Sequence, residues 1–200
     1  MNAHVRAVVA ALLMVGGAAS ARAQDVRLTV EEREGTYQVR GEFKVALPVS
    51  AVWTVLADYD HIHEFVSSMR SSTLEYVEGG YLRVRQVAVA GVFPFRRTIH
   101  VLLDIREDAG SRIVFTDVLH EDFQTYAGEW TVVSGSPRDS TARTTVRYAL
   151  DAQLRAGVPS MLGRPMMSRG ARDLLRQVRA EIVRRARLAR ERRDPSALRR

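Results

Sequence analysis

The spacing of apolar residues changes once along this chain, and that change limits the folds the chain can adopt. Between residues 69 and 154, apolar and polar side chains alternate, and short polar or glycine-containing turns interrupt the alternation. Such alternation is typical of antiparallel strands that bury one face. From residue 160 onward the spacing is helical. One apolar stripe consists of Ala171, Leu174, Leu175, Val178 and Ile182. The pattern therefore predicts an antiparallel sheet with one long C-terminal helix lying across it.

The segments before residue 69 complete the expected order of elements. Residues 26–34 and 37–47 alternate as strands do. Pro48 and Ser50 favour the start of a short helix, with Ser50 as its N-cap. A break at residues 58–60 then separates it from a second short helix. The strands expected after these helices cover residues 69–78, 81–89, 95–106, 112–119, 123–133 and 141–154.

Together these elements predict an α+β fold. A curved antiparallel sheet of about seven strands wraps around the C-terminal helix, and two short helices follow the first strand. Apolar residues make up 46% of the chain, which is enough to bury a substantial core. Since no repeat or low-complexity linker interrupts the pattern, the elements belong to one domain.

The first 23 residues have the composition of a secretory signal peptide. Arg6 gives a positive start, residues 7–19 are apolar, and Ala21-Arg22-Ala23 is a small-x-small cleavage site. The apolar stretch is shorter than the roughly 20 residues of a spanning helix, so an uncleaved anchor is the minor alternative. The sequence predicts cleavage between Ala23 and Gln24 and a periplasmic or secreted mature protein.

The formal net charge of +7 is concentrated at the two ends of the chain. Residues 24–183 contain 20 basic and 21 acidic side chains, whereas residues 184–200 contain eight arginines and two acidic residues. Because a nucleic-acid-binding protein needs a basic surface on the fold itself, nucleic acid is not an expected partner. The arginine-rich tail at residues 187–200 either makes weak contact with anionic lipid or is a solvated helix end.

One stretch carries a resemblance to a known superfamily. Residues 48–75 read PVSAVWTVLADYDHIHEFVSSMRSSTLE, Gly128-Glu129-Trp130 lie in a late strand, and the last helix follows a proline. This pattern resembles START-like (SRPBCC) domains of the polyketide cyclase/dehydrase and coenzyme Q-binding type. The resemblance covers nearly the whole mature chain, and it places a START-like ligand-binding domain at residues 24–186.

The resemblance implies the helix-grip fold, in which the sheet and the C-terminal helix enclose a hydrophobic molecule. Such domains usually carry a lipid, quinone, sterol or polyketide-like ligand, and some relatives are enzymes. No cofactor is implied. Residues on the inward phase of the expected strands and helices are the candidates for ligand contact. They are Tyr59, Phe65, Met69, Val84, Gln86, Phe95, Arg97, Ile99, Val101, Trp130, Tyr148, Leu150, Met166, Leu174 and Val178.

Two polar side chains lie on the same side of an expected strand as apolar residues, and their presence there has two interpretations. Gln86 lies in phase with Val84, and Arg97 lies in phase with Ile99. Buried polar groups need partners, so either a neighbouring side chain or a polar group of the ligand satisfies them. The methionines at the start of the last helix, Met166 among them, either border an adaptable opening or pack on the sheet edge.

The sequence gives weaker evidence for a catalytic or metal-binding site than for a ligand-binding domain. Asp58, Asp60, His61, His63 and Glu64 lie close together, but no third metal ligand is set by the spacing. The resemblance to START-like domains also implies that an Asp at this break caps the next helix. The candidates for general acid–base chemistry are His100, Asp117, His120 and Glu129. His100 is out of phase with its apolar neighbours, and residues 120–122 lie in a turn, so both are expected at the surface.

Three functions therefore remain open. The leading hypothesis is an exported carrier that holds a lipid-like, quinone-like or polycyclic molecule between the sheet and residues 171–183. The second is a cyclase- or dehydratase-type enzyme that acts on such a molecule. The third is an interaction domain whose cavity is filled by its own side chains. Without cysteine, the chain has neither disulfides nor a thiol nucleophile.

Overall fold

The computed structural model describes residues 26–76, 81–92, 95–135, 144–155 and 160–193. The predicted signal peptide, its cleavage site and the end of the arginine-rich tail lie outside these residues. The described strands form a single antiparallel sheet in the order β1-β2-β8-β7-β6-β5-β4-β3. The strands are β1 (Arg27–Arg33), β2 (Thr36–Val45), β3 (Met69–Tyr76), β4 (Leu82–Val92), β5 (Phe95–Asp108), β6 (Arg112–Asp117), β7 (Phe123–Ser134) and β8 (Thr144–Leu154).

The described helices follow the predicted order, with one correction to the fold description. They are α1 (Val49–Leu56), the 3-10 helix η1 (Tyr59–His61), α2 (Ile62–Phe65) and α3 (Ser160–Arg193). The short helices come after the second strand, and the sheet has eight described strands instead of about seven. The first strand, β1, was expected from the alternation in residues 26–34, and it pairs with β2 through a tight turn at Glu34 and Gly35. Both turn residues have positive φ (52° and 77°), as a two-residue hairpin turn requires.

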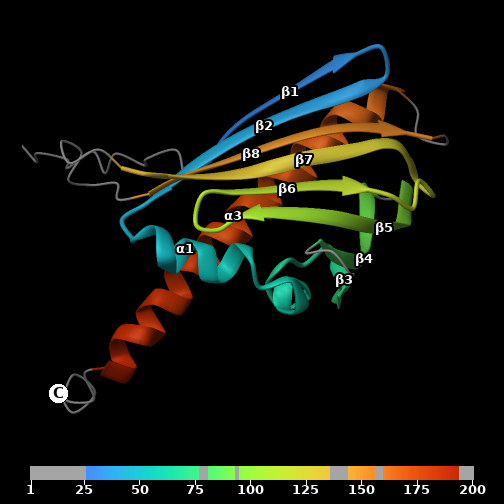
Figure 1. Ribbon diagram of the computed structural model, residues 1–200. Helices are drawn as coiled ribbons and strands as arrows, with labels where there is room; N and C mark the ends of the chain where they lie inside the picture. The colour runs from blue at the N-terminus through green and yellow to red at the C-terminus, as the bar shows by residue number, and fades with distance from the viewer. Residues whose placement is uncertain (1–25, 77–80, 93–94, 136–143, 156–159, 194–200) are drawn as a thin grey trace, which may run out of the picture.

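Helix α3 crosses one face of the sheet diagonally and continues beyond its edge (Figure 1). The predicted apolar stripe faces the sheet, since Ala171, Leu175, Val178 and Ile182 are all buried. The helix and β2 approach closely at Gly41, where a Cβ atom would lie only 2.4 Å from Leu175 Cδ1. This contact holds the middle of α3 on the sheet, and it confirms the helix-grip architecture.

The two short helices differ from the prediction at their caps. Helix α1 begins at Val49, with Pro48 in the N-cap position and no side-chain cap. Ser50 therefore lies inside the helix, where its carbonyl oxygen accepts a hydrogen bond from Thr54 Oγ1 (2.9 Å). Asp58 does precede η1, but its carboxylate binds other groups and makes no capping hydrogen bond. Proline fixes the φ angle for helix entry without a side-chain acceptor, which explains the first difference.

The outer face of the sheet carries charged side chains instead of a second layer. Ion pairs join neighbouring strands at distances of 2.5–3.1 Å between Arg40 and Asp151, Glu42 and Arg147, Arg83 and Asp104, and Arg112 and Glu129. Exposed pairs of this kind stabilise a fold by about 1 kcal/mol at most, so they mark a solvated surface. None of the helices in the described part of the chain combines the length and the apolar character that a membrane-spanning helix requires.

Candidate ligand-binding site

A cavity of about 270 Å³ lies between the inner face of the sheet and the N-terminal half of α3. Strands β4, β5, β7 and β8 supply one wall, α3 supplies the other, and the segment between α2 and β3 closes one side. The volume is close to the lower end of the range for small-molecule sites, roughly 300–1,000 Å³.

Small side chains on β4 create this space. Ala88, Ala90 and Gly91 line the cavity, and Ala88 and Ala90 pair with Ile99 and Arg97 on β5. Because alanine and glycine project little beyond the backbone, α3 and the sheet do not fill the region between them. Ile99 is one of several buried apolar side chains in the walls. The others include Val101, Phe123 and Leu150.

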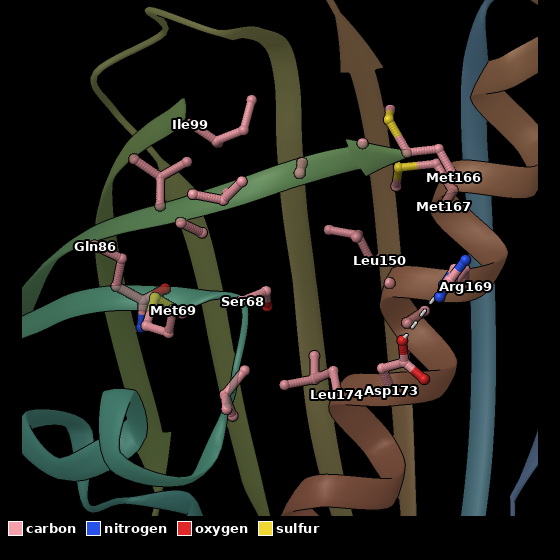
Figure 2. A pocket seen from close by; sticks show the side chains of 18 of the residues that line it. Ser68, Met69, Gln86, Ile99, Leu150, Met166, Met167, Arg169, Asp173 and Leu174 are labelled. Carbon is pink, nitrogen blue, oxygen red and sulfur yellow. Dashed lines mark ion pairs between the residues drawn. The ribbon is translucent and has the colours of Figure 1, made fainter. Parts of the chain in front are cut away.

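The helical wall is apolar and adaptable in shape. Met166, Met167 and Leu174 on α3 face Ile99, Gln86 and Met69 across the cavity (Figure 2). Unbranched methionine side chains adapt to differently shaped partners. This wall can therefore accommodate an apolar molecule without one fixed shape.

Polar residues surround the mouth of the cavity. Ser67, Ser68, Arg169 and Asp173 line it and are exposed, and Arg169 and Asp173 form a loose ion pair (4.0 Å). Two hydrogen bonds fix the segment before β3 on α3. Ser67 N donates to Gln177 Oε1 (3.0 Å), and Gln177 Nε2 donates to Ser67 Oγ (2.9 Å). The mouth of the cavity is thus polar and solvent-exposed, whereas the interior is apolar.

The structure shows which groups bind the polar side chains of Gln86 and Arg97, the two polar residues predicted to face inward. Gln86 Nε2 donates to Ser72 Oγ (3.2 Å), and the Arg97 guanidinium binds the carboxylate of Asp122. Neighbouring side chains therefore satisfy both residues, as the first of the two interpretations predicted. Both also line the cavity, so each is within reach of a ligand.

Two tyrosines place hydroxyl groups in the apolar wall. Tyr126 and Tyr148 both line the cavity, and their hydroxyls are hydrogen-bonded to each other. Burial raises the pKa of both hydroxyls above the ordinary value of 10.0. The pair therefore stays protonated at neutral pH and can donate a hydrogen bond, but neither hydroxyl can act as a general base. Aromatic rings pack around the pair from Phe115, Phe123 and Trp130.

Most of the residues predicted from the sequence to contact a ligand do line this cavity. The nine residues at the cavity are Met69, Gln86, Arg97, Ile99, Val101, Tyr148, Leu150, Met166 and Leu174. Their direct contact with a ligand remains a prediction. Phe95 begins β5, but its side chain lies outside what the structure describes.

The other five predicted residues lie elsewhere. Val84 and Val178 are buried in the core, where sheet and helix are in contact and leave no space. Trp130 packs against Tyr148, with ring centroids 4.5 Å apart. Tyr59 donates a hydrogen bond to Glu107, and Phe65 lies under the Arg185 guanidinium. The position of each residue along its element takes it away from the cavity.

The sequence reasoning missed several wall residues. They include Val66, Ser67, Ser68, Ala88, Val89, Ala90, Gly91, Phe123, Tyr126, Leu154, Arg169, Gly170 and Asp173. The small residues Ala88, Ala90 and Gly91 were a usable signal, because alternating alanines on an inward-facing side of a strand leave space. The Ser67–Ser68 segment had no such signal, since its position depends on contacts with α3.

Three of the polar residues near η1, Asp58, Asp60 and His61, have structural partners. Asp58 binds His61 Nδ1 (2.6 Å) and Arg185 Nη1 (2.5 Å), and Asp60 accepts a hydrogen bond from Leu74 N (2.6 Å). Burial alone would raise the pKa of Asp58, but its bonds to His61 and Arg185 lower that pKa below the ordinary value. These bonds favour a structural role for the two carboxylates.

The candidates for acid–base chemistry do not line the described cavity. Asp117 is fully buried and accepts hydrogen bonds from the backbone N–H groups of Leu102, Leu119 and His120. Glu129 binds Arg112 on the outer face. Asp122, expected at the surface, is instead buried, because the turn folds its carboxylate onto β5.

Comparison with known proteins identifies the family. The chain matches the family described as polyketide cyclase / dehydrase and lipid transport over residues 45–179. It belongs to this family. The matched segment begins at the end of β2 and ends inside α3, so it contains the cavity-lining strands, the short helices and the helical wall. Among curated proteins, no sequence matches the chain.

Solved structures confirm the START-like fold. The ZhuI aromatase/cyclase from Streptomyces sp. R1128 is 22% identical and covers 77% of this chain and 98% of its own, with a TM-score of 0.61. A STAR-related lipid transfer protein from Xanthomonas axonopodis is 16% identical and covers 80% of this chain and 94% of its own, also with a TM-score of 0.61. A protein from Thermus thermophilus is 20% identical, covers 73% of this chain and 97% of its own, and has a TM-score of 0.60.

Proposed function

We propose that this chain is an exported carrier that binds one hydrophobic molecule between the sheet and α3. The observation that carries the proposal is the cavity itself, which has apolar walls, a polar mouth and space that side chains do not fill. A filled interaction domain, the third hypothesis, would lack that space. Membership of a family described as including lipid transport supports the same function.

Burial of apolar surface would supply most of the affinity. Each 100 Å² of apolar ligand surface removed from water contributes about 2.5 kcal/mol. The cavity walls offer few polar groups. These groups would set the orientation of the ligand, and the apolar walls would supply most of the affinity. The tyrosine pair, on β7 and β8, can donate one hydrogen bond to the ligand. Arg97 on β5 and Gln86 on β4 also line the cavity and are further polar groups within reach of the ligand. We therefore expect a lipid-like, quinone-like or polycyclic ligand with at least one hydrogen-bond acceptor.

An enzymatic function receives less support from the geometry. Among the described cavity residues, the titratable groups are Arg97, Tyr126, Tyr148, Arg169 and Asp173. The tyrosines are held protonated, and Asp173 is exposed at the mouth beside Arg169. General base catalysis needs a proton acceptor within reach of the substrate, and the described interior offers none.

Export belongs to the proposal as well. A periplasmic or secreted location, after cleavage between Ala23 and Gln24, would let the carrier move a hydrophobic molecule across an aqueous compartment. The same purified sample tests this point, because the intact mass of the exported protein shows whether the chain begins at Gln24.

The decisive experiment is native mass spectrometry of the exported protein, followed by organic extraction and identification of what travels with it. We expect one apolar molecule per chain. A protein that is empty, and that also takes up no member of a panel of lipids, quinones and polycyclic compounds, would refute the carrier function.

A matched pair of variants locates the ligand. In Ala88→Phe the new ring occupies the cavity, so we expect ligand uptake to fall at least tenfold while the circular dichroism spectrum is retained. Ala149→Phe adds the same ring on the outer face of β8, where Ala149 pairs with Arg40 and Glu129, and should leave uptake unchanged. Equal uptake by both variants would mean that the ligand binds elsewhere.

The arginine-rich end of α3 supports a weak contact with a membrane surface. Arg187, Arg190 and Arg192 are exposed near the C-terminal end of α3. This end of the helix extends beyond the sheet (Figure 1). Basic side chains near an anionic bilayer each contribute about 1 kcal/mol. Such a contact would hold the carrier near the bilayer from which it loads or to which it delivers.

A further inference from the structure

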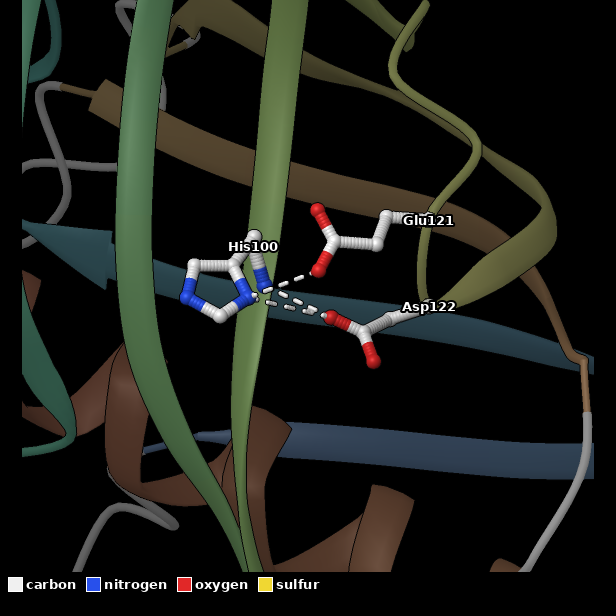
Figure 3. Close-up of side chains that lie close together, drawn as sticks. All are labelled: His100, Glu121 and Asp122. Carbon is white, nitrogen blue, oxygen red and sulfur yellow. Dashed lines mark hydrogen bonds and ion pairs between the residues drawn. The ribbon is translucent and has the colours of Figure 1, made fainter.

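One group of metal-ligating side chains lies outside the cavity. His100 comes from β5, and Glu121 and Asp122 come from the segment between β6 and β7, about twenty residues later in the chain. One ligand atom from each residue lies within 4.8 Å of the other two (Figure 3). From this geometry we infer a divalent-metal site, built for zinc, at His100, Glu121 and Asp122.

The two separations from the His100 imidazole fit ligands around a shared ion better than they fit hydrogen bonds. His100 Nδ1 lies 3.4 Å from Glu121 Oε1 and 3.6 Å from Asp122 Oδ2. An N–H···O hydrogen bond spans about 2.7–3.2 Å. Two ligand atoms bound to one tetrahedral zinc at about 2.0–2.1 Å are roughly 3.3 Å apart. Small side-chain movements therefore bring the imidazole and both carboxylates into coordination.

The buried ligand is held in place before any metal binds. Asp122 is 5% exposed, its Oδ2 accepts a hydrogen bond from the His100 backbone N–H (2.8 Å), and its Oδ1 binds Arg97. The backbone carbonyl of Asp122 also accepts a hydrogen bond from Arg155 N (3.1 Å). Bonds of this kind orient metal ligands in known sites. Arg97 opposes a cation electrostatically, but it binds the oxygen that does not face His100.

The other two ligands are accessible from solvent. The side chains of His100 and Glu121 are 43% and 57% exposed, so an ion can enter and water can occupy the remaining position. One imidazole and two carboxylates form a donor set suited to zinc. The site also borders the cavity, because Arg97 and Phe123, on either side of Asp122, both line it. Zinc would therefore fasten the segment that precedes β7 to β5, next to the cavity wall.

The test is isothermal titration calorimetry with zinc chloride on the untagged protein, after a chelator has been used and removed. We expect one zinc per chain, together with a zinc-dependent rise in Tm. His100→Ala and Glu121→Gln should each weaken binding at least tenfold. The control His63→Ala removes another exposed imidazole and should change nothing.

Three outcomes would overturn the site. The first is wild-type protein that binds no zinc at millimolar concentration, which would leave His100 in a plain ion pair with the carboxylates. The second is binding by His100→Ala and Glu121→Gln that is as tight as that of wild type. The third is a loss of affinity in His63→Ala equal to that in His100→Ala, which would mean adventitious surface binding. His100 and Glu121 are both partly exposed, so the circular dichroism spectra of the two variants should match that of wild type. If His100→Ala does not fold, Glu121→Gln still tests the site.

Discussion

At the scale of single residues, Gly128 on β7 lies where a side chain has no room. A Cβ atom there would be 2.3 Å from the carbonyl oxygen of Ala149 and 2.6 Å from the Phe115 ring. The first of these atoms belongs to the backbone of β8, which cannot rotate away. Gly170 on α3 is the opposite case, because a Cβ atom would meet nothing within 4 Å.

These two glycines give opposite predictions for the same substitution. Gly128→Ala forces β7 and β8 apart and should lower the free energy of unfolding by about 1–3 kcal/mol. Gly170→Ala removes the entropy cost of glycine inside a helix and should raise it by about 0.5–1 kcal/mol. Urea unfolding of both variants measures the difference. Destabilisation by Gly170→Ala would show that the mouth of the cavity is more crowded than the structure indicates.

At the scale of elements, Arg185 joins α3 to the segment around η1. Its guanidinium binds Asp58 (2.5 Å) and Glu181 (2.6 Å), and Arg184 also binds Glu181 (2.6 Å). The Glu181 side chain is 4% exposed. The bond from Arg184 is the largest influence on Glu181 and lowers the pKa of that carboxyl below 4.5, against the effect of burial.

This network predicts how the free energy of unfolding depends on pH in the acidic range. The pKa values of Asp58 and Glu181 are lower in the folded protein than their ordinary values of 3.8 and 4.5. The unfolded chain therefore takes up protons first, so the stabilisation is complete above about pH 4.5 and is lost as the pH falls through the folded pKa values. Urea unfolding between pH 7 and pH 3 should show a decline that is shallower in Arg185→Gln.

The same variant should cost stability at neutral pH. Removal of the guanidinium leaves Glu181 with one partner fewer, and we expect a loss of about 1–3 kcal/mol. Arg187→Gln breaks an exposed pair with Glu191 on the same helix and should cost less than about 0.5 kcal/mol. An identical acid profile in wild type and Arg185→Gln would exclude this network as the source of the pH dependence.

At the scale of the whole molecule, the excess of positive charge and the cavity belong to different parts of the chain. Residues 24–183 are nearly neutral, whereas residues 184–200 contain eight arginines and two acidic residues. Replacing Arg187, Arg190 and Arg192 with Gln should therefore separate membrane contact from ligand binding. The expected loss is about 3 kcal/mol, or roughly a hundredfold, in the affinity for anionic vesicles.

Co-sedimentation with vesicles of anionic phospholipid at low salt measures this effect. Wild-type protein should pellet, and added salt should release it, because a Debye length of about 10 Å at 0.1 M screens the attraction. Vesicles of zwitterionic lipid are the control for charge, and unchanged ligand uptake by the triple variant is the control for folding. Equal sedimentation of the triple variant and wild type would refute contact through these arginines.

The sequence by itself determined the type, order and approximate extent of nearly every described element. The alternation in residues 123–133 predicted β7, and the stripe from Ala171 to Ile182 predicted the buried face of α3. These signals are local, because the period of a strand or helix sets which side of the element each residue faces. The same phase brought Gln86, Ile99 and Leu150 to the cavity, together with six other predicted residues.

Only the tertiary structure decided where an inward face meets open space and where it meets another side chain. Val178 and Leu174 have neighbouring positions on the same helix, yet one is buried in the core and the other lines the cavity. That difference depends on the distance between sheet and helix, which is the sum of many non-local contacts such as that of Gly41 with Leu175. His100 and Asp122 meet for the same reason, because strand pairing and turn geometry, and not sequence period, bring β5 and the turn before β7 together.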